Sequence, residues 1–408
     1  MTTSLGDLPS ELLREIGEYL SARDIEALRC TCKRVDNAFA VEHDLFWKQK
    51  LASEYPLDVD FATTNDANAY LCYKAVARLR RLIVESMNVC SLMFCHSMLL
   101  DYTNDRHIMR SMVKEPLTQV EFLYLEQSHL TNVPPELGQL RQLETLDLSY
   151  NHLTSVPSQL GRLSRLKQLY LHNNQLRSIP PELGRLIRLK TLFLYENQLE
   201  DIPPELGQLF QLTNLNLSCN LLTRVPPELG QLSQLEYLSL SCNRFFSSGV
   251  PPEIWHFTQL RGLWFSGNQL ADVPLKIVQL VHLRALDLSD NHLTRVPPEL
   301  GRFPQLWDLN LSTNHLTSVP AELGQLSKLD RLNLSKNELT SLPPELGHLT
   351  CLSNIDLSFN QLTDIPMELG QLCKLLSIRV KGNPLMMSTM PVGWEKIAKN
   401  TPDCHPHH

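Results

Sequence analysis

The chain has 408 residues, 43% of them hydrophobic, which is enough to bury a large core. Its formal net charge of -7 and its pI near 6.1 argue against nucleic acid as the main ligand. The first residues lack the apolar core of a signal peptide, and the longest apolar run, Ser91 to Leu100, is too short to span a membrane. The ten cysteines are scattered, without the paired caps of secreted repeat proteins. An intracellular, reducing location is therefore expected, cytoplasmic or nuclear.

The first predicted element is an amphipathic helix that begins near Pro9. Its apolar positions recur at helical spacing: Leu12, Leu13, Ile16 and Leu20. Ser21 and Asp24 resemble a capping box, so a second helix is expected there, with Ile25 and Leu28 on its apolar face. Cys32, Phe46 and Trp47 complete a small three-helix unit. A unit of about 45 residues buries too little surface to be stable alone, which predicts a partner over its exposed leucines.

The order of these residues resembles an F-box over residues 5–50. The matching positions are Leu8, Pro9, Leu12, Ile16, Leu20, Asp24, Ile25, Leu28, Cys32 and Trp47. F-box proteins dock onto the Skp-type adaptor of Skp-Cullin-F-box ubiquitin ligases, so the resemblance implies that adaptor and, through it, a cullin as partners. It assigns the adaptor contact to Leu8, Pro9, Leu12, Ile16, Leu20 and Leu28, and internal packing to Trp47. The alternative is an unrelated helical cap on the segment that follows.

Residues 51–116 are expected to form a helical linker and an N-terminal cap. Tyr70 to Val84 contains KAVARLRRL and is predicted to be a helix with a solvated basic face. The run from Ser91 to Leu100 is expected to cover the first apolar end of the repeats described next.

A leucine-rich repeat occupies residues 117–387. The string L-x-x-L-x-L-x-x-N-x-L recurs from Val120 to Leu375 in about twelve units, every 23 residues except for one step of 25 from Leu235 to Leu260. Each unit is too short to close a core, so neighbours must stack. The predicted fold class is therefore α/β: the three-helix unit, then a leucine-rich repeat solenoid with a parallel, concave β face and short helical or extended convex segments.

Each unit combines two local patterns. Alternation around Leu146-Asp147-Leu148 predicts a short strand with its apolar side chains inward. Val133 to Leu140, VPPELGQL, predicts a short helix or bend: proline suits its first turn, glutamate its positive end, and glycine is expected to interrupt it. Residues 388–408 are expected to form a C-terminal cap and tail, with a closing helix from Trp394 to Lys399.

A column of asparagines is predicted to form a buried ladder that satisfies backbone groups of the turns. Its members are Asn151, Asn174, Asn197, Asn220, Asn243, Asn268, Asn291, Asn314, Asn337, Asn360 and Asn383, with Ser128 in the first unit. The units resemble the Ras-group intracellular class of these repeats. F-box proteins with leucine-rich repeats more often have cysteine where this chain has asparagine, so no known substrate transfers by resemblance.

Outward strand positions carry the candidate target-binding residues. They depart from a background of serine, asparagine and aspartate, the serines running from Ser218 to Ser358 in the later units. Exposed aromatic side chains are typical interface anchors. The candidates are Phe122, Tyr124, Tyr170, Phe193, Tyr195, Tyr237 and Trp264. The alternative is that these rings pack against the N-terminal region.

Two further columns leave alternatives open. Cys219 and Cys242 occupy equivalent positions in adjacent units, as free thiols or as a redox-sensitive pair. Four histidines form two adjacent pairs that are either exposed loop residues or metal ligands: His129, His152, His292 and His315. No catalytic residue, metal site or cofactor is predicted.

The two segments together predict a substrate-recognition subunit of a ubiquitin ligase, which docks the adaptor through the F-box and a protein target through the repeats. Three alternatives remain: a non-degradative signalling scaffold, a pathogen-encoded decoy of the adaptor, and a repeat protein with its own catalytic cysteine. The last would need a sizeable catalytic domain, and about twenty residues follow the final repeat.

Overall fold

The computed structural model describes residues 120–245, 250–385, 391 and 394. These residues divide between two compact units, Met1–Gln175 and Leu176–His408. The predicted F-box segment 5–50, the linker 51–116 and the insertion at Phe246 to Gly249 lie outside the described residues. Each described repeat contributes one strand of three residues and one 3-10 helix of five, except that the last strand has no helix after it.

The first unit contains the strands β1 (Phe122–Tyr124), β2 (Thr145–Asp147) and β3 (Gln168–Tyr170). The second contains β4 (Thr191–Phe193), β5 (Asn214–Asn216), β6 (Tyr237–Ser239), β7 (Gly262–Trp264), β8 (Ala285–Asp287), β9 (Asp308–Asn310), β10 (Arg331–Asn333), β11 (Asn354–Asp356) and β12 (Ser377–Arg379). Within each unit neighbouring strands pair in parallel and in chain order. Leu238 pairs with Leu263, so the 25-residue step keeps the register.

The middle residue of every strand points into the core. Leu123 and Leu146 are 2% and 0% exposed, and Leu125 and Leu148, two residues further on, are also buried. Leucines from the helical segments close the other side, such as Leu137 and Leu140 in the first repeat. The apolar surface of a repeat is covered only when a neighbouring repeat stacks on it. The pattern therefore specifies a solenoid. The predicted fold class is confirmed.

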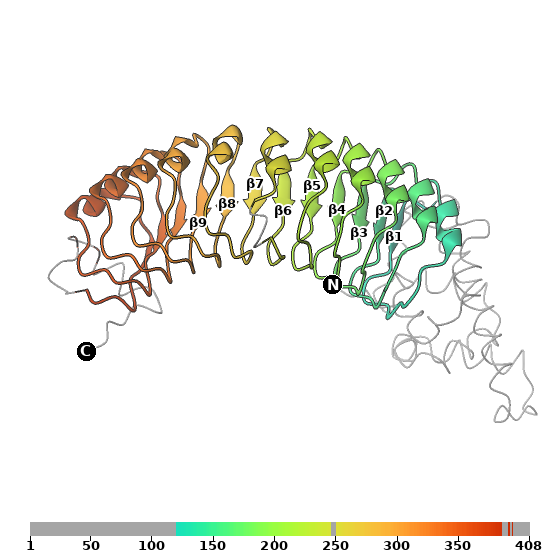
Figure 1. The fold of residues 1–408 in the computed structure, drawn as a ribbon, viewed down its shortest axis with the longest axis horizontal. Helices are drawn as coiled ribbons and strands as arrows, with labels where there is room; N and C mark the ends of the chain where they lie inside the picture. The colour runs from blue at the N-terminus through green and yellow to red at the C-terminus, as the bar shows by residue number, and fades with distance from the viewer. Residues whose placement is uncertain (1–119, 246–249, 386–390, 392–393, 395–408) are drawn as a thin grey trace, which may run out of the picture. The chain divides into compact units, whose positions relative to one another are not determined.

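The PPELG strings form 3-10 helices. The first unit has η4 (Pro135–Gln139) and η5 (Ser158–Arg162); the second has η6 (Pro181–Arg185), η7 (Pro204–Gln208), η8 (Pro227–Gln231), η9 (Pro252–His256), η10 (Leu275–Gln279), η11 (Pro298–Arg302), η12 (Ala321–Gln325), η13 (Pro344–His348) and η14 (Met367–Gln371). Within each unit, Figure 1 shows the 3-10 helices beside the strands. In η4, Pro134 has φ -71° and ψ 140° before the helix, and the N–H of Leu137 donates to its carbonyl at 3.1 Å. Proline at the next position loses no hydrogen bond, because a first-turn N–H has no partner inside the helix.

The glycine of these strings does not interrupt the helix, contrary to the sequence-based expectation. Gly207 is the fourth residue of η7 and is buried. A Cβ atom on Gly207 would lie 2.7 Å from the carbonyl carbon of Glu228 in the next repeat, closer than real Cβ atoms approach. Glycine is therefore required because the helical segments of successive repeats stack in backbone contact.

The asparagine ladder is confirmed. Asn314 accepts a hydrogen bond at Oδ1 from the N–H of Leu293, at 3.0 Å. Its Nδ2 donates to the carbonyls of Leu288, Leu311 and Ser312 at 3.0 to 3.2 Å. The amide thus binds its own turn and the preceding repeat, and it satisfies backbone groups that are buried away from water.

Both ends of the repeat array carry a distinct residue. In the first repeat, buried Ser128 takes the asparagine position, and its N–H donates to Oδ1 of Asn151 at 3.0 Å. After the last repeat, Trp394 is 2% exposed and its N–H donates to the carbonyl of Pro391 at 3.1 Å. The remainder of the closing helix expected up to Lys399 lies outside the described residues.

Candidate target-binding surface

The first and third residues of each strand point away from the leucine core and form what we call the sheet face. Most of them are half-buried, as in β3, β4 and β5. Alternation along a strand places these two residues on the same side. A ligand on this face therefore meets two columns of side chains, one from each position.

The background residues of the sheet face have a structural role. Oδ1 of Asp287 accepts hydrogen bonds from the N–H and the hydroxyl of Ser289, at 2.9 and 2.6 Å. The same arrangement joins Asn310 to Ser312 and Asn333 to Ser335. Aspartate or asparagine with serine two residues later therefore caps the end of the strand by satisfying a backbone N–H. This explains why serine recurs through the later repeats.

Aromatic pairs replace this cap in two strands. In the first unit, Tyr170 and His172 meet edge-on, with ring centroids 6.2 Å apart. In the second unit, Phe193 and Tyr195 lie at 6.1 Å with tilted rings. Both members of the polar pair are exchanged together, so each of these strands presents a two-ring platform.

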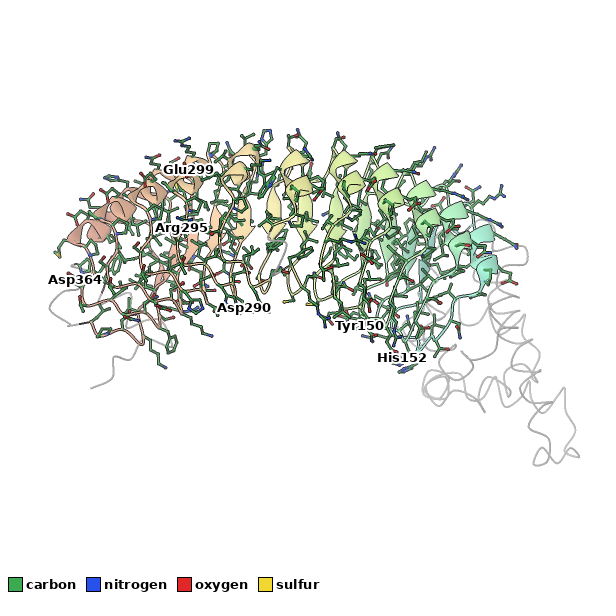
Figure 2. The ribbon with its side chains drawn as sticks, viewed as in Figure 1. Tyr150, His152, Asp290, Arg295, Glu299 and Asp364 are labelled. Atoms are coloured by element: carbon green, nitrogen blue, oxygen red, sulfur yellow. The ribbon has the colours of Figure 1, made fainter. Side chains whose placement is uncertain are left out.

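The pair in the first unit has further aromatic contacts. Tyr150, in the loop after β2, meets His172 edge-on at 5.3 Å, and Figure 2 shows Tyr150 and His152 on the loop edge of this unit. Burial raises the pKa of Tyr170, and the charge of Asp147 and the neighbouring Tyr124 raise it further. The phenol of Tyr170 is already neutral at physiological pH, and the raised pKa moves its ionisation further from that range.

A second aromatic cluster lies in β6 and β7. The rings of Tyr237 and Trp264 stack with centroids 6.4 Å apart. Gly262 makes this possible, because a Cβ atom on it would lie 2.5 Å from Cη2 of Trp264 and 3.0 Å from Cδ1 of Tyr237. Sequence reasoning did not identify Gly262, although a glycine at an outward position beside an aromatic is a usable signal of close approach.

All seven predicted target-binding residues lie on strands or directly after them. Phe122, Tyr124 and Tyr170 belong to the first unit; Phe193, Tyr195, Tyr237 and Trp264 belong to the second. Tyr237 is the most exposed of the seven at 36%, and the others are half-buried. The structure brings Phe193 together with Tyr195, and Tyr237 together with Trp264. A single patch that joins Tyr170 to Phe193 and Tyr195 stays a prediction.

The second unit also has a hollow of about 300 Å³ on its sheet face. The hollow runs from Trp264 in β7 to Arg379 in β12, and we call it the β7–β12 groove. Its charged lining residues are Asp287, Asp308, Arg331, Asp356 and Arg379. The charged side chains of the groove were not among the predicted target-binding residues. Asp308 and Arg331 occupy the first strand position, so a comparison of that position across the repeats is the signal that could have identified them.

Charges in the β7–β12 groove are unevenly paired. At one end Arg379 contacts Asp356, with Nη1 and Oδ2 3.4 Å apart. Arg331 lies over the ring of Trp307, 5.4 Å from its centroid. Burial raises the pKa of Asp308; the neighbouring Arg331 lowers it, while Asp287 and Asp330 raise it.

The structure favours free thiols for the cysteine column and exposed loop residues for the histidine column. Cys219 and Cys242 are free and exposed, and burial, with the neighbouring Cys242 and Glu196, raises the pKa of Cys219 to about 11. A thiol with a raised pKa is a poor nucleophile at neutral pH, which favours the interpretation as free thiols. His129 and His152 stack in exposed loops, as do His292 and His315, each pair with centroids 5.7 Å apart.

Within the described ranges, no group of three or more histidine, cysteine or acidic side chains is placed to hold a metal ion. No helix in the part of the chain that the structure describes is long and apolar enough to cross a membrane. Figure 2 shows Asp290 on the loop edge of the second unit and Glu299 among its 3-10 helices, so the polar side chains are distributed around the repeats.

Family comparisons match both parts of the sequence. An F-box domain matches residues 5–35, which include all six predicted adaptor-binding residues. A leucine-rich repeat region matches residues 158–272, and further leucine-rich repeat models match 118–176, 282–303 and 304–362. No curated protein matches the chain significantly.

Solved structures resemble the repeats. A leucine-rich repeat protein of Leptospira interrogans is 32% identical, with 74% of this chain and 86% of that chain covered and a TM-score of 0.51. A plant peptide hormone receptor, RGFR1 in complex with RGF2, is 30% identical over 68% of this chain and 46% of that chain, with a TM-score of 0.57. A TDR receptor is 26% identical over 70% and 50%, with a TM-score of 0.62. The chain spans about half the length of these two receptors.

The repeat pattern, the stacked strands with their asparagine ladder and the similarity to the Leptospira protein agree. The chain belongs to the leucine-rich repeat family, and it carries an F-box domain ahead of its repeats.

Proposed function

We propose that this chain is the substrate-recognition subunit of a Skp-Cullin-F-box ubiquitin ligase. An F-box followed by leucine-rich repeats supports a protein-interaction role, and the F-box implies a Skp-type adaptor as partner. The cullin is reached through that adaptor. The adaptor contact is assigned to the six predicted F-box residues, Leu8, Pro9, Leu12, Ile16, Leu20 and Leu28.

The observation that carries the second half of the proposal is the exchange of strand caps for aromatic pairs on the sheet face. Phe193 and Tyr195 stand where other repeats use a hydrogen-bonded polar pair, and their two rings lie with centroids 6.1 Å apart. Half-buried aromatic rings commonly dominate the binding energy of protein interfaces. The similar plant receptor was solved with a peptide hormone, which supports a polypeptide ligand for such repeats.

In this role no residue of the chain reacts with the target. Binding the target and the conjugating machinery at once raises their effective concentration and thereby the rate of transfer. F-box and leucine-rich repeat proteins are typically non-catalytic adaptors. The site of action is the cytoplasm, the nucleus or both, in the host cell if a pathogen encodes the chain, and it involves neither nucleic acid nor a membrane.

The test is a crossed comparison of two variants of the full chain, each expressed in cells and purified with its partners for quantitative proteomics. Leu12→Asp with Ile16→Asp should lose the adaptor and the cullin and keep the target, because an unpaired charge in an apolar contact is costly. Phe193→Ala with Tyr195→Ala should keep the adaptor and reduce the target about thirtyfold, as expected for a loss of about 2 kcal/mol.

The matched control is Ile187→Ala with Phe210→Ala, which removes exposed apolar side chains, 57% and 53% exposed, away from the sheet face of the same repeats. This control should retain both partners. Loss of the target in the control and retention in the aromatic variant would place the binding surface elsewhere. If the wild-type chain does not retain the adaptor, a non-degradative scaffold is favoured. The regular repeats also support that alternative.

A further inference from the structure

The β7–β12 groove arises from the side chains at the first position of each strand. In β6 and β10 this position carries the long side chains of Tyr237 and Arg331, whereas in β7 and β8 it carries Gly262 and Ala285. Gly262 leaves room for the indole of Trp264, which lies over it, and the small side chain of Ala285 lines the hollow beside that indole. The hollow therefore has an aromatic wall in Trp264, and Leu286, Leu332 and Ile355 also line it.

Two carboxylates border the same space. Asp287 and Asp308 come from the neighbouring strands β8 and β9 and both line the hollow together with Trp264. Ser289 occupies Oδ1 of Asp287, which leaves Oδ2 to a ligand. Arg331, which also lines the groove and lowers the pKa of Asp308, lies over the ring of Trp307 at 5.4 Å and contacts Oδ2 of Asp330 at 3.6 Å. Partial burial raises the pKa of Asp308 despite Arg331, as expected for a carboxylate that lacks a full counter-charge.

We propose that the β7–β12 groove binds an extended peptide through one cationic side chain, arginine in preference to lysine, held between Asp287, Asp308 and the indole of Trp264. A guanidinium can stack on an indole and bond to carboxylates in its plane, whereas an ammonium provides only a compact charge. The inference rests on the proposed function in one respect, because the peptide would belong to the recruited target. The proposed site lies in the later repeats, whose outward strand positions carry mostly serine, asparagine and aspartate.

The rest of the groove suits the backbone of such a peptide. Oδ1 of Asn310 and Asn333 accept from Ser312 and Ser335, which leaves Nδ2 of each as a donor to peptide carbonyls. At the far end, Arg379 is held by Asp356. The cation-binding part of the groove is thus confined to the end next to Trp264.

The experiment uses the purified full chain and a fluorescein-labelled peptide, Gly-Arg-Ser-Arg-Ser-Arg-Gly, measured by fluorescence anisotropy. The same peptide with citrulline at each arginine keeps the planar shape, loses the charge and exchanges one NH2 donor for a carbonyl oxygen; it should bind at least about tenfold more weakly. A lysine version should fall between the two. Asp287→Asn with Asp308→Asn, and separately Trp264→Ala, should each weaken the arginine peptide at least about tenfold.

The repeats themselves indicate that the double variant folds. Asparagine already stands at the position of Asp287 in Asn310 and Asn333, and at the position of Asp308 in Asn354. The matched control is Asp201→Asn with Asp272→Asn, which removes the same charge from two exposed aspartates, paired with Arg224 and Arg295, outside the groove. It should leave peptide affinity within about twofold.

Three results would overturn the inference: no measurable binding of the arginine peptide, equal binding of the citrulline peptide, or an equal loss in the control variant. Adaptor binding is measured on the same preparations. If the adaptor does not bind but the peptide still requires Asp287 and Asp308, the proposed function fails and the peptide site stands.

Discussion

The indole of Trp264 lies over Gly262, where a Cβ atom would come within 2.5 Å of Cη2. Gly262→Ala should therefore push the ring away from Tyr237 and out of its place in the β7–β12 groove. The backbone tolerates the change, since Ala285 occupies the equivalent position in the next repeat. Loss of a contact of about 1 kcal/mol should weaken the arginine peptide about fivefold in the anisotropy assay. Unchanged affinity would mean that the ring position does not matter for binding.

The stacking of the 3-10 helices predicts opposite tolerance at two equivalent glycines. A Cβ on Gly324 would lie 2.7 Å from the carbonyl carbon of Glu345, whereas a Cβ on Gly230 meets only the side chain of His256, with Nδ1 at 3.0 Å. Gly324→Ala should reduce the free energy of unfolding by about 1 to 3 kcal/mol, because backbone must move. Gly230→Ala should cost less than about 1 kcal/mol, because a side chain can rotate. Urea denaturation measures both, and equal midpoints would contradict backbone contact between repeats.

The asparagine ladder predicts a large cost for one of its inner members. Asn291 accepts from the N–H groups of Asn268 and Leu270 and donates to three carbonyls. Asn291→Ala should lower the free energy of unfolding by about 2 to 4 kcal/mol, since several buried backbone groups lose their partner. Asn383→Ala, at the half-buried end of the ladder, should cost less. A midpoint for Asn291→Ala equal to that of the wild type would show that the ladder is not needed for stability.

The repeat fold followed from the sequence because its period fixes what each residue does. The positions of Leu146 and Asn151 recur with the repeat period, as leucine or isoleucine and, after the first repeat, as asparagine, and a repeat that cannot bury its own leucines must stack on the next. The role of Gly207 could not be read in this way. Glycine in a short helical segment reads locally as a break, whereas its cause is the approach of Glu228 from the next repeat.

The aromatic residues of the sheet face were also predictable, since each departs from a polar background. The β7–β12 groove was less predictable, because it depends on small side chains at outward positions and not on distinctive ones. Gly262 leaves room for the indole of Trp264, and Ala285 lines the hollow beside it, because β7 and β8 pair in register. The structural role of the recurring serines was likewise not predictable from their own position. Ser289, for example, donates its hydroxyl to Asp287 at the end of a strand, so the role depends on two positions together.

Cys219 should react as a weakly acidic thiol. Burial and its neighbours raise its pKa from 9.0 to about 11, so the thiolate that attacks an alkylating agent forms only at high pH. The rate of alkylation by iodoacetamide, followed for the Cys219 peptide by mass spectrometry, should be half-maximal near pH 11. Cys242→Ser should move the midpoint down only in part, because burial is the largest cause. A midpoint near 9 in the wild-type chain would contradict this environment for the thiol.

The proposed ligase function requires the F-box at residues 5–35 to bind a Skp-type adaptor. Isothermal titration calorimetry of the purified full chain with a purified Skp-type adaptor tests this directly, with Leu12→Asp plus Ile16→Asp as the comparison. We predict a tight complex for the wild-type chain and at least about a hundredfold weaker binding for the variant, since each buried charge costs several kcal/mol. The urea midpoint of the repeats should be the same in both proteins. Equal affinity of the two proteins for the adaptor, or no binding by the wild-type chain, would contradict the proposed function.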